Sequence, residues 1–351
     1  MTAPRSFARP EWRDLVLYQP PASPVEIDLS DNTSRFGVPP SALAVLRDEA
    51  TTEVTRYPDA YGAPLKQALA EYARVTPAQV VTGCGSDDVL DCAVRAFARE
   101  GGRFAHIDPT FPMAPRFARL SGLVPVAVPL AADGSFDPGA MLAGDPVLLY
   151  LCSPNNPTGA LLDPQAVERV IARATGVVLV DEAYAEFVGH GLVSQAPSRR
   201  GLLVTRTLSK AFGLAGLRAG YACGAEELVR EVELVRGPYR VTLTAERAAT
   251  AAVRGDVGWV MARAAEAVAL RERLAVELRT MGHSPLPSAA NFVLVPIAGA
   301  VRVAAHMRAA GVAVRSFEAL PGVGDALRIT AAPWPQLERA LAALSEAMRC
   351  A

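Results

Sequence analysis

Short apolar runs alternate with amphipathic stretches through the first two thirds of the chain. Seven runs occur between residues 79 and 224: QVVTG (79–83), RFAHID (103–108), VPVAVPL (124–130), VLLYLC (147–152), GVVLVDE (176–182), GLLVTRT (201–207) and RAGYACG (218–224). Stretches such as DDVLDCAVRAFARE and DPQAVERVIARA, which lie between them, have apolar residues at helical spacing. Continuous apolar strands that alternate with helices are typical of a mostly parallel sheet buried on both faces. The pattern therefore predicts an α/β fold with a seven-stranded sheet between helices.

The pattern of predicted helices and strands changes beyond Pro238. An Ala-rich helical region covers 244–282, and strands and helices follow at 291–297 (strand), 300–311 (helix), 312–317 and 326–330 (strands) and 334–348 (helix). This order predicts a smaller C-terminal α/β domain. We expect an N-terminal arm and small-domain segment at 1–35, a large cofactor-binding domain at 36–238 and a small domain at 239–351.

Composition narrows the class of protein. The chain has 351 residues, of which 51% are hydrophobic and 20% charged, as in a globular enzyme. The net charge of −1 argues against nucleic-acid binding. No long apolar run indicates a membrane span, and the N-terminus lacks a signal-peptide core, so we expect a cytoplasmic protein. The five cysteines and four histidines are scattered, which argues against a disulfide frame or a metal site.

Lysine usage points to a special position. The chain has only two lysines, Lys66 and Lys210, against 33 arginines. Lys210 lies in TLSKAFGLAGLRAG (207–220), between Ser209 and Arg218. Unlike arginine, lysine can lose its proton and form a Schiff base with a carbonyl. By itself, however, Lys210 could equally be an ordinary surface residue.

Other polar groups follow the predicted strands, where ligands bind in open α/β sheets. GCGSDD (83–88) precedes a helix that Ser86 and Asp87 could cap, and the loop CSPNNPTG (152–159) offers the amides of Asn155 and Asn156. Asp181 ends a buried strand, with Tyr184 three residues on. Each motif also has an ordinary reading, as a helix start, an Asn-Pro turn or an exposed loop carboxylate.

Taken together, the motifs meet the needs of pyridoxal phosphate. The aldehyde needs Lys210, and the pyridine nitrogen needs an acidic partner such as Asp181. The phosphate needs hydroxyls and an arginine, which Thr207, Ser209 and Arg218 supply. Phe111, in DPTFPMAP after the strand at 103–108, could cover the ring face.

The combination resembles the fold-type-I aminotransferases and, more narrowly, the histidinol-phosphate aminotransferase group. The resemblance extends over nearly the whole chain and rests on RYPDAYG, GCGSDD, DPTFPMAP, CSPNNPTG, VDEAY, RTLSKAFGLAGLRAGY, VAVRSF and ALRIT. It implies a pyridoxal-phosphate enzyme that transfers an amino group to a 2-oxo acid. The catalytic residues that it implies are Lys210, Asp181 and Tyr184.

The resemblance also implies the remaining site residues. Asn156 and Tyr184 would contact the ring hydroxyl, and Phe111 would stack on the ring. Ser86, Asp87, Thr207, Ser209 and Arg218 would surround the phosphate. Tyr57 would reach the phosphate of a neighbouring subunit, which implies a homodimer with shared active sites. The substrate would contact Tyr18, Asn156, Arg315 and Arg328, of which Arg328 takes its anionic group.

The sequence departs from the group on the substrate side. Its usual Asn-Glu-Asn-Pro-Tyr-Gly segment reads DNTSRFG (31–37), and its N-terminal Tyr-x-Pro-Gly reads YQPP (18–21). The ring-stacking residue, usually tyrosine, is Phe111. An aminotransferase for another, specialised or aromatic, amino acid and a phosphothreonine-type decarboxylase therefore stay open. A NAD-dependent dehydrogenase is disfavoured, because no GxGxxG follows the first strand, and a transcription regulator would need a DNA-binding domain.

Overall fold

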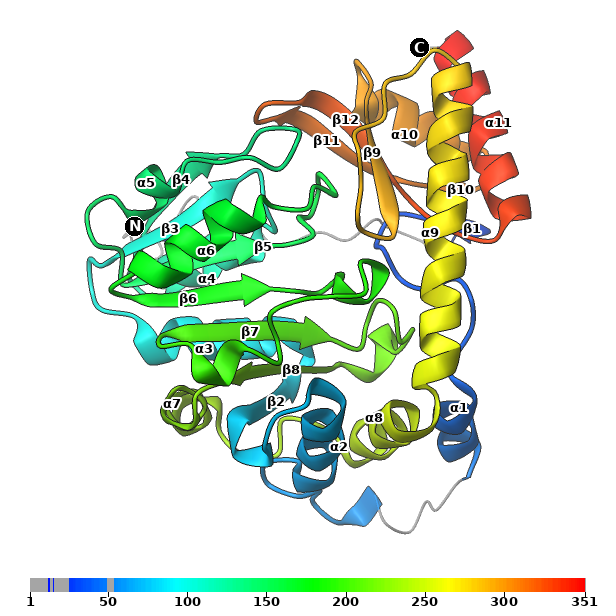
Figure 1. Cartoon of the computed structure of the whole chain (residues 1–351). Helices are drawn as coiled ribbons and strands as arrows, with labels where there is room; N and C mark the ends of the chain where they lie inside the picture. The colour runs from blue at the N-terminus through cyan, green and yellow to red at the C-terminus, as the bar shows by residue number, and fades with distance from the viewer. Residues whose placement is uncertain (1–11, 13–14, 16–24, 49–53, 351) are drawn as a thin grey trace, which may run out of the picture.

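A seven-stranded sheet forms the centre of the computed structural model, which describes residues 12, 15, 25–48 and 54–350 (Figure 1). Its strand order is β2-β8-β7-β6-β5-β3-β4. Neighbouring strands run parallel, except that β8 is antiparallel to both β2 and β7. The strands are β2 (Val80–Cys84), β3 (Arg103–Asp108), β4 (Val124–Pro129), β5 (Leu148–Cys152), β6 (Val177–Asp181), β7 (Leu202–Thr207) and β8 (Ala219–Gly224). The predicted mostly parallel seven-stranded sheet is confirmed.

Helices cover both faces of this sheet, which explains the continuous apolar runs. Every residue of β5 and β7 is buried. One face packs against α3 (Gly85–Phe97), α4 (Met113–Leu120) and α7 (Glu226–Arg236). The other packs against a second group: α1 (Pro40–Arg47), α2 (Ala63–Ala73), α5 (Pro138–Leu142), α6 (Pro164–Arg173) and α8 (Leu243–Gly255). A strand covered on both sides gains from apolar residues at every position.

A smaller sheet, of order β11-β12-β9, is built from the C-terminal part of the chain. Its strands are antiparallel, and nearby β1 pairs with β10 in parallel. The elements are β1 (Ile27–Asp28), α9 (Val257–Thr280), β9 (Phe292–Pro296), α10 (Ala300–Ala309), β10 (Val312–Ala313), β11 (Arg315–Leu320), β12 (Gly324–Thr330) and α11 (Trp334–Cys350). The single strand predicted at 312–317 is thus two strands, which pair with different partners.

The long helix α9 joins the two parts (Figure 1). Val260, in the first turn of α9, belongs to the apolar cluster of the large sheet, whereas Leu274 and Leu278 belong to that of the small one. Helix α8, which follows residue 238, still packs against the large sheet. We therefore propose that the boundary between the domains lies within α9 rather than at residue 238. Among the described helices, α9 included, none has the length and apolarity to span a bilayer.

The topology fixes where the predicted motifs meet. Strands β2, β3, β5, β6 and β7 point the same way, so their carboxyl ends share one edge of the sheet. Two short helices follow strands at this edge, η4 (Ala185–Phe187) after β6 and η6 (Ala215–Leu217) after β7. Two others precede strands, η3 (Pro77–Gln79) before β2 and η5 (Ala196–Ser198) before β7. The loops at this edge carry the candidate residues of the site.

Candidate active site

Lys210 lies just beyond β7 and faces charged groups from several elements. Its Nζ donates a hydrogen bond to the carbonyl oxygen of Asp31 at 2.8 Å. Burial and the nearby Arg328 lower the pKa of the Lys210 ammonium to about 8, while Asp31 and Asp87 act in the opposite direction. An amine of this pKa is partly neutral near physiological pH and can act as a nucleophile or base.

A cradle for an anion lies where β2 enters α3. Gly85 has a φ of +82°, and a Cβ there would lie 2.4 Å from the guanidinium of Arg218. A Cβ on Gly220, in β8, would lie 2.3 Å from the backbone nitrogen of Ser86. The two glycines thus let the strand and Arg218 approach the N-terminus of α3, whose free N–H groups attract anions.

Hydroxyls from the β7 loop complete the cradle. Arg218 donates to Ser209 Oγ at 3.4 Å, and the Ser209 backbone donates to Thr207 Oγ1 at 3.1 Å. Arg218 also lies 3.7 Å from Asp87. The structure therefore brings together Ser86, Asp87, Thr207, Ser209 and Arg218.

The predicted capping of α3 by Ser86 or Asp87 is wrong. The helix begins at Gly85, and no side chain caps it from the N-cap position at Cys84. Instead Asp88 Oδ2 accepts from the Cys84 backbone nitrogen at 2.9 Å. The reason is that β2 runs directly into α3, so Ser86 and Asp87 lie within the first turn, where their own side chains do not reach the free N–H groups.

Asp181 is buried at the end of β6. Tyr150 donates to its Oδ2 at 2.8 Å, and the Ala183 backbone donates to Oδ1 at 3.1 Å. Burial raises the pKa of Asp181 to about 6, against the lowering effect of these hydrogen bonds. In the described part of the chain no basic side chain forms an ion pair with Asp181. A buried carboxylate that has no basic side chain as partner can pair with a cationic group of a bound ligand.

Arg328, in β12, approaches the site from the small sheet. It is buried, donates to Ser30 O at 2.7 Å and donates to Asn156 Oδ1. Arg315 lies directly opposite Arg328 in the antiparallel pair of β11 and β12. Directly opposed residues share one face of a sheet, so the two arginines present cationic groups to the same side.

The loop after β5 has separate tasks for its two asparagines. Asn155 is fully buried and donates to Pro109 O and to Thr158 Oγ1, both at 2.9 Å. These bonds tie the loop to the turn that carries Phe111. Asn156, in contrast, is partly exposed and bonds to Arg328.

The sequence reasoning missed Asn32 as a site residue. Its Nδ2 donates to the Tyr184 hydroxyl at 2.9 Å, and its own backbone is held by Thr330 and Asn291. Asn32 lies in DNTSRFG (31–37), the segment that departs from the usual sequence of the group. Its position joins the N-terminal segment, the small sheet and the loop after β6.

Two exposed aromatic rings lie apart from this cluster. Tyr57 is 81% exposed and stacks on Tyr239, with ring centroids 4.6 Å apart. The Tyr239 backbone has a φ of 61° and donates to Ala60 O at 2.8 Å. The structure thus does not bring Tyr57 to the site of its own chain. Tyr18 lies outside the described residues.

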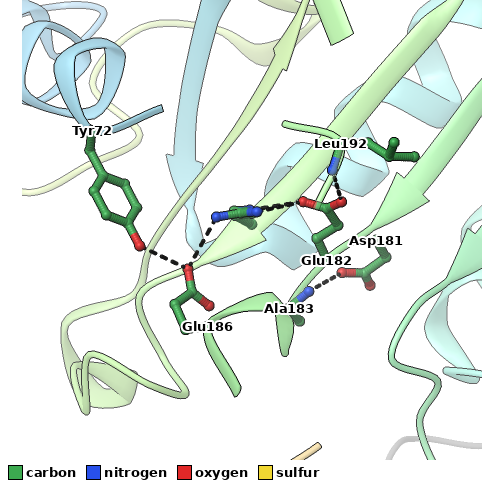
Figure 2. A network of polar contacts seen from close by, with 7 residues as sticks. Tyr72, Asp181, Glu182, Ala183, Glu186 and Leu192 are labelled. Carbon is green, nitrogen blue, oxygen red and sulfur yellow. Dashed lines mark hydrogen bonds and ion pairs between the residues drawn. The ribbon is translucent and has the colours of Figure 1, made fainter. Parts of the chain in front are cut away.

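A buried ionic network lies behind the site (Figure 2). Arg206 donates to Glu182 Oε2 through Nε at 2.9 Å and through a terminal nitrogen at 2.8 Å. It also lies 3.6 Å from Glu186, to which Tyr72 donates at 3.4 Å. Glu182 further accepts from the Leu192 backbone nitrogen. Because Glu182 follows Asp181 directly and Glu186 lies two residues beyond Tyr184, the network fixes the chain just after Asp181 and on both sides of Tyr184.

Comparison with known proteins identifies the family. The family model described as aminotransferase class I and II matches residues 24–344. The chain belongs to this family. Its relatives include a histidinol-phosphate aminotransferase of Thermoanaerobacter sp. (strain X514), 33% identical over 93% of this chain and 94% of that protein. An aromatic amino acid aminotransferase of Mycobacterium bovis is 36% identical over 82% of this chain and 84% of that protein.

A solved structure agrees with both fold and family. The histidinol-phosphate aminotransferase of Sinorhizobium meliloti, in complex with pyridoxal-5'-phosphate, has a TM-score of 0.87 and 27% identity. The alignment covers 98% of each chain. The protein is therefore an aminotransferase of fold type I, as the sequence predicted.

Proposed function

We propose that this aminotransferase binds pyridoxal phosphate at Lys210 and acts on histidinol phosphate, with a 2-oxo acid as acceptor. The observation that carries the proposal is the position of Lys210. Its amine has a pKa of about 8 and lies among Asp31, Asp87, Arg218 and Arg328. A lone lysine of lowered pKa beside an anion cradle suits a cofactor that carries both an aldehyde and a phosphate.

The residues present fit this cofactor at three points. The cradle of Gly85, Ser209 and Arg218 suits the phosphate, since it combines a helix N-terminus, a hydroxyl and a guanidinium. Asp181, buried without a basic partner in the described chain, suits the pyridine nitrogen. Tyr184 and Asn156 supply polar groups for the ring hydroxyl, and Phe111 an aromatic face.

The chain's own residues explain the proton transfers. When bound, pyridoxal phosphate supplies the electron sink for the charge that develops at the substrate Cα. Lys210 Nζ, which is neutral above about pH 8, can take the Cα proton as a base and later give it back as an acid. Asp181 stabilises positive charge at the ring nitrogen. Tyr184, held by Asn32, keeps its hydroxyl directed into the site.

The substrate assignment depends on two arginines. Arg328 and Arg315 lie on the same side of the β11–β12 pair, so both can contact one phosphate group. Histidinol phosphate has a phosphate and no carboxylate, which suits two guanidinium groups. The relatives named histidinol-phosphate aminotransferase support this choice.

An aromatic amino acid is the second candidate. Arg328 lies over the rings of Phe292 and Phe317, at 5.3 and 5.7 Å from their centroids. These rings offer apolar surface beside the anion-binding group, and a Mycobacterium bovis relative is an aromatic amino acid aminotransferase. For such a substrate Arg328 alone would hold the carboxylate. A phosphothreonine-type decarboxylase would use the same groups and would release carbon dioxide.

We also infer a cytoplasmic homodimer with shared sites. An exposed pair of stacked tyrosines is unusual on a free surface, and Val54 and Leu234 are also exposed, by 65% and 69%. A second copy of the chain would cover such rings and could receive the Tyr57 hydroxyl at its cofactor phosphate. The match of Tyr57 to the family's shared-site tyrosine supports this inference.

A spectral titration tests the proposed function. Purified protein is loaded with pyridoxal phosphate, and histidinol phosphate, phenylalanine and phosphothreonine are added in separate single-turnover reactions. We expect conversion of the bound cofactor to pyridoxamine phosphate, fastest with histidinol phosphate. The Lys66→Ala protein is the matched control and should react normally, because Lys66 is paired with Glu233 at 2.7 Å, away from the site. Faster conversion by phenylalanine would favour the aromatic reading, and carbon dioxide release would favour the decarboxylase.

A further inference from the structure

A fully buried tyrosine stands beside Asp181. Tyr150 has 0% exposure and donates its hydroxyl proton to Asp181 Oδ2 at 2.8 Å. In the register of β5 and β6, Cys152 pairs with Asp181 and Tyr150 pairs with Leu179. Tyr150 and Asp181 are therefore diagonal neighbours on one face of the sheet, a separation that an aromatic side chain spans. Phe104, whose ring lies 6.4 Å away, packs along the Tyr150 ring.

The other groups that face Asp181 do not supply a positive charge. They are the Cys152 thiol from β5, Asp87 from α3 and the Tyr184 hydroxyl from the loop after β6. Thr205, which pairs with Asp181 in the register of β6 and β7, and the Ala183 backbone, which donates to Oδ1, are both neutral. Burial and Asp87 both favour the protonated carboxyl, and Tyr150 is the largest influence against them.

The nearest arginine in the sheet is already engaged. Arg206 follows Thr205 in β7 and therefore points to the opposite face, where it bonds to Glu182 and lies 3.6 Å from Glu186. Successive residues of a strand face opposite sides, so the same rule separates Asp181 from Glu182. Arg206 therefore balances negative charge on Glu182 and Glu186. Asp181 is stabilised by its hydrogen bonds and not by this arginine.

We propose that Tyr150 is a positioning residue that keeps Asp181 ionised and aimed at the ring nitrogen of the cofactor, an assignment that rests on the proposed function. The hydroxyl of Tyr150 occupies Oδ2 and the Ala183 amide occupies Oδ1. Tyr150 is fixed by β5 and Ala183 by the turn that follows β6 directly, so the two donors hold the carboxylate from both of its oxygens.

Tyr150→Phe removes only the hydroxyl. A hydrogen bond to a charged group lowers the acceptor's pKa by about 1 to 2 pH units. The pKa of Asp181 should therefore rise from about 6 to about 7–8 in the variant. At neutral pH much of the carboxyl would then carry its own proton and could not hold one on the ring nitrogen.

The first measurement uses the full chain freed of cofactor, with carboxyl-labelled aspartate followed by NMR across pH. Asp181→Asn identifies the signal. Tyr221→Phe is the matched control, because Tyr221 is another fully buried tyrosine of the same sheet and its hydroxyl has no hydrogen-bond partner among the described residues. We expect the Asp181 midpoint to rise in Tyr150→Phe and to stay unchanged in Tyr221→Phe. Equal midpoints in wild type and Tyr150→Phe would overturn the proposal.

Two further readouts guard against a merely structural effect. Replacing all tyrosines by fluorotyrosine, which makes the phenol a stronger donor, should lower the Asp181 midpoint in wild type and not in Tyr150→Phe. In the loaded enzyme, NMR of ring-nitrogen-labelled cofactor should show a protonated nitrogen in wild type and loss of this proton in Tyr150→Phe. A protonated ring in both proteins contradicts the assignment. Failure of wild type to bind pyridoxal phosphate would instead refute the proposed function, and the cofactor-free titration would still decide the role of Tyr150.

Discussion

The lowered pKa of Lys210 gives a prediction that can be tested without any substrate. Burial is the largest cause of the lowering, and the charge of Arg328 is the next. Arg328→Gln removes this charge and keeps a polar side chain of similar length. The pKa of Lys210 should then rise above about 8 but stay below that of a free lysine, because burial remains.

The size of the effect follows from the two pKa values. With a pKa of about 8, about one Lys210 amine in ten is neutral at pH 7, against about one in 3,000 for an ordinary lysine. The reactive fraction is thus about 300 times larger. The difference corresponds to about 3 kcal/mol, which is an upper value because the side chain is only partly buried.

The assay is reductive labelling of the cofactor-free protein with pyridoxal, which lacks the phosphate. Peptide mass spectrometry quantifies label at residue 210 across pH, and Lys66 gives a reference site on the same molecule. We expect labelling at Lys210 to reach half its maximum near pH 8 and to require higher pH in Arg328→Gln. Arg315→Gln, which removes the same charge from the neighbouring strand, should move the midpoint less.

Two results would refute this reasoning. A wild-type midpoint at the value of free lysine would show that the site does not depress the pKa of Lys210. The same midpoint in the wild type, Arg328→Gln and Arg315→Gln would show that the charge of Arg328 does not act on the Lys210 amine.

Three further predictions concern the loaded enzyme. Asp181→Asn should keep the fold and cofactor but lose most turnover, because an amide cannot hold the proton on the ring nitrogen; near-normal single-turnover rates would contradict this. Arg328→Ala should raise KM for an anionic substrate by far more than it weakens cofactor binding, since losing such a pair costs about 2–5 kcal/mol. With histidinol phosphate Arg315→Ala should raise KM as well, whereas with a neutral amino acid it should not. Mixing inactive Tyr57→Ala and Lys210→Ala subunits should restore part of the activity, because one site in each mixed dimer is free of both changes; a fully active monomer on sedimentation would exclude shared sites.

The large sheet could be predicted because strands that are buried on both faces have apolar residues at nearly every position. Each strand from β2 to β8 is a nearly unbroken apolar run, and the runs match the observed strands closely. The domain boundary is less visible. Helix α8 has the same Ala-rich texture as α9, and only its packing against α1 and α2 shows which core it joins.

The candidate site likewise contains residues with a local sequence signal and residues without one. That Lys210, Asp181 and Arg218 lie near one edge of the sheet could be predicted, because each stands beside a strand in a recognisable motif; their roles in the site stay predictions. Asn32 could not, because it reaches Tyr184 across 152 positions of the chain and has no local signature. Tyr150 lay hidden inside an apolar run, although a two-residue repeat along β5 and β6 places it on the same face as Asp181.

The most direct test of the central claim is to ask where the cofactor is attached. The purified protein, loaded with pyridoxal phosphate, is reduced with borohydride, digested and analysed by mass spectrometry, with Lys210→Ala treated in parallel. The account predicts phosphopyridoxyl label on residue 210 in the wild type and no label in Lys210→Ala. Label on Lys66, or no label on the wild type, would contradict it.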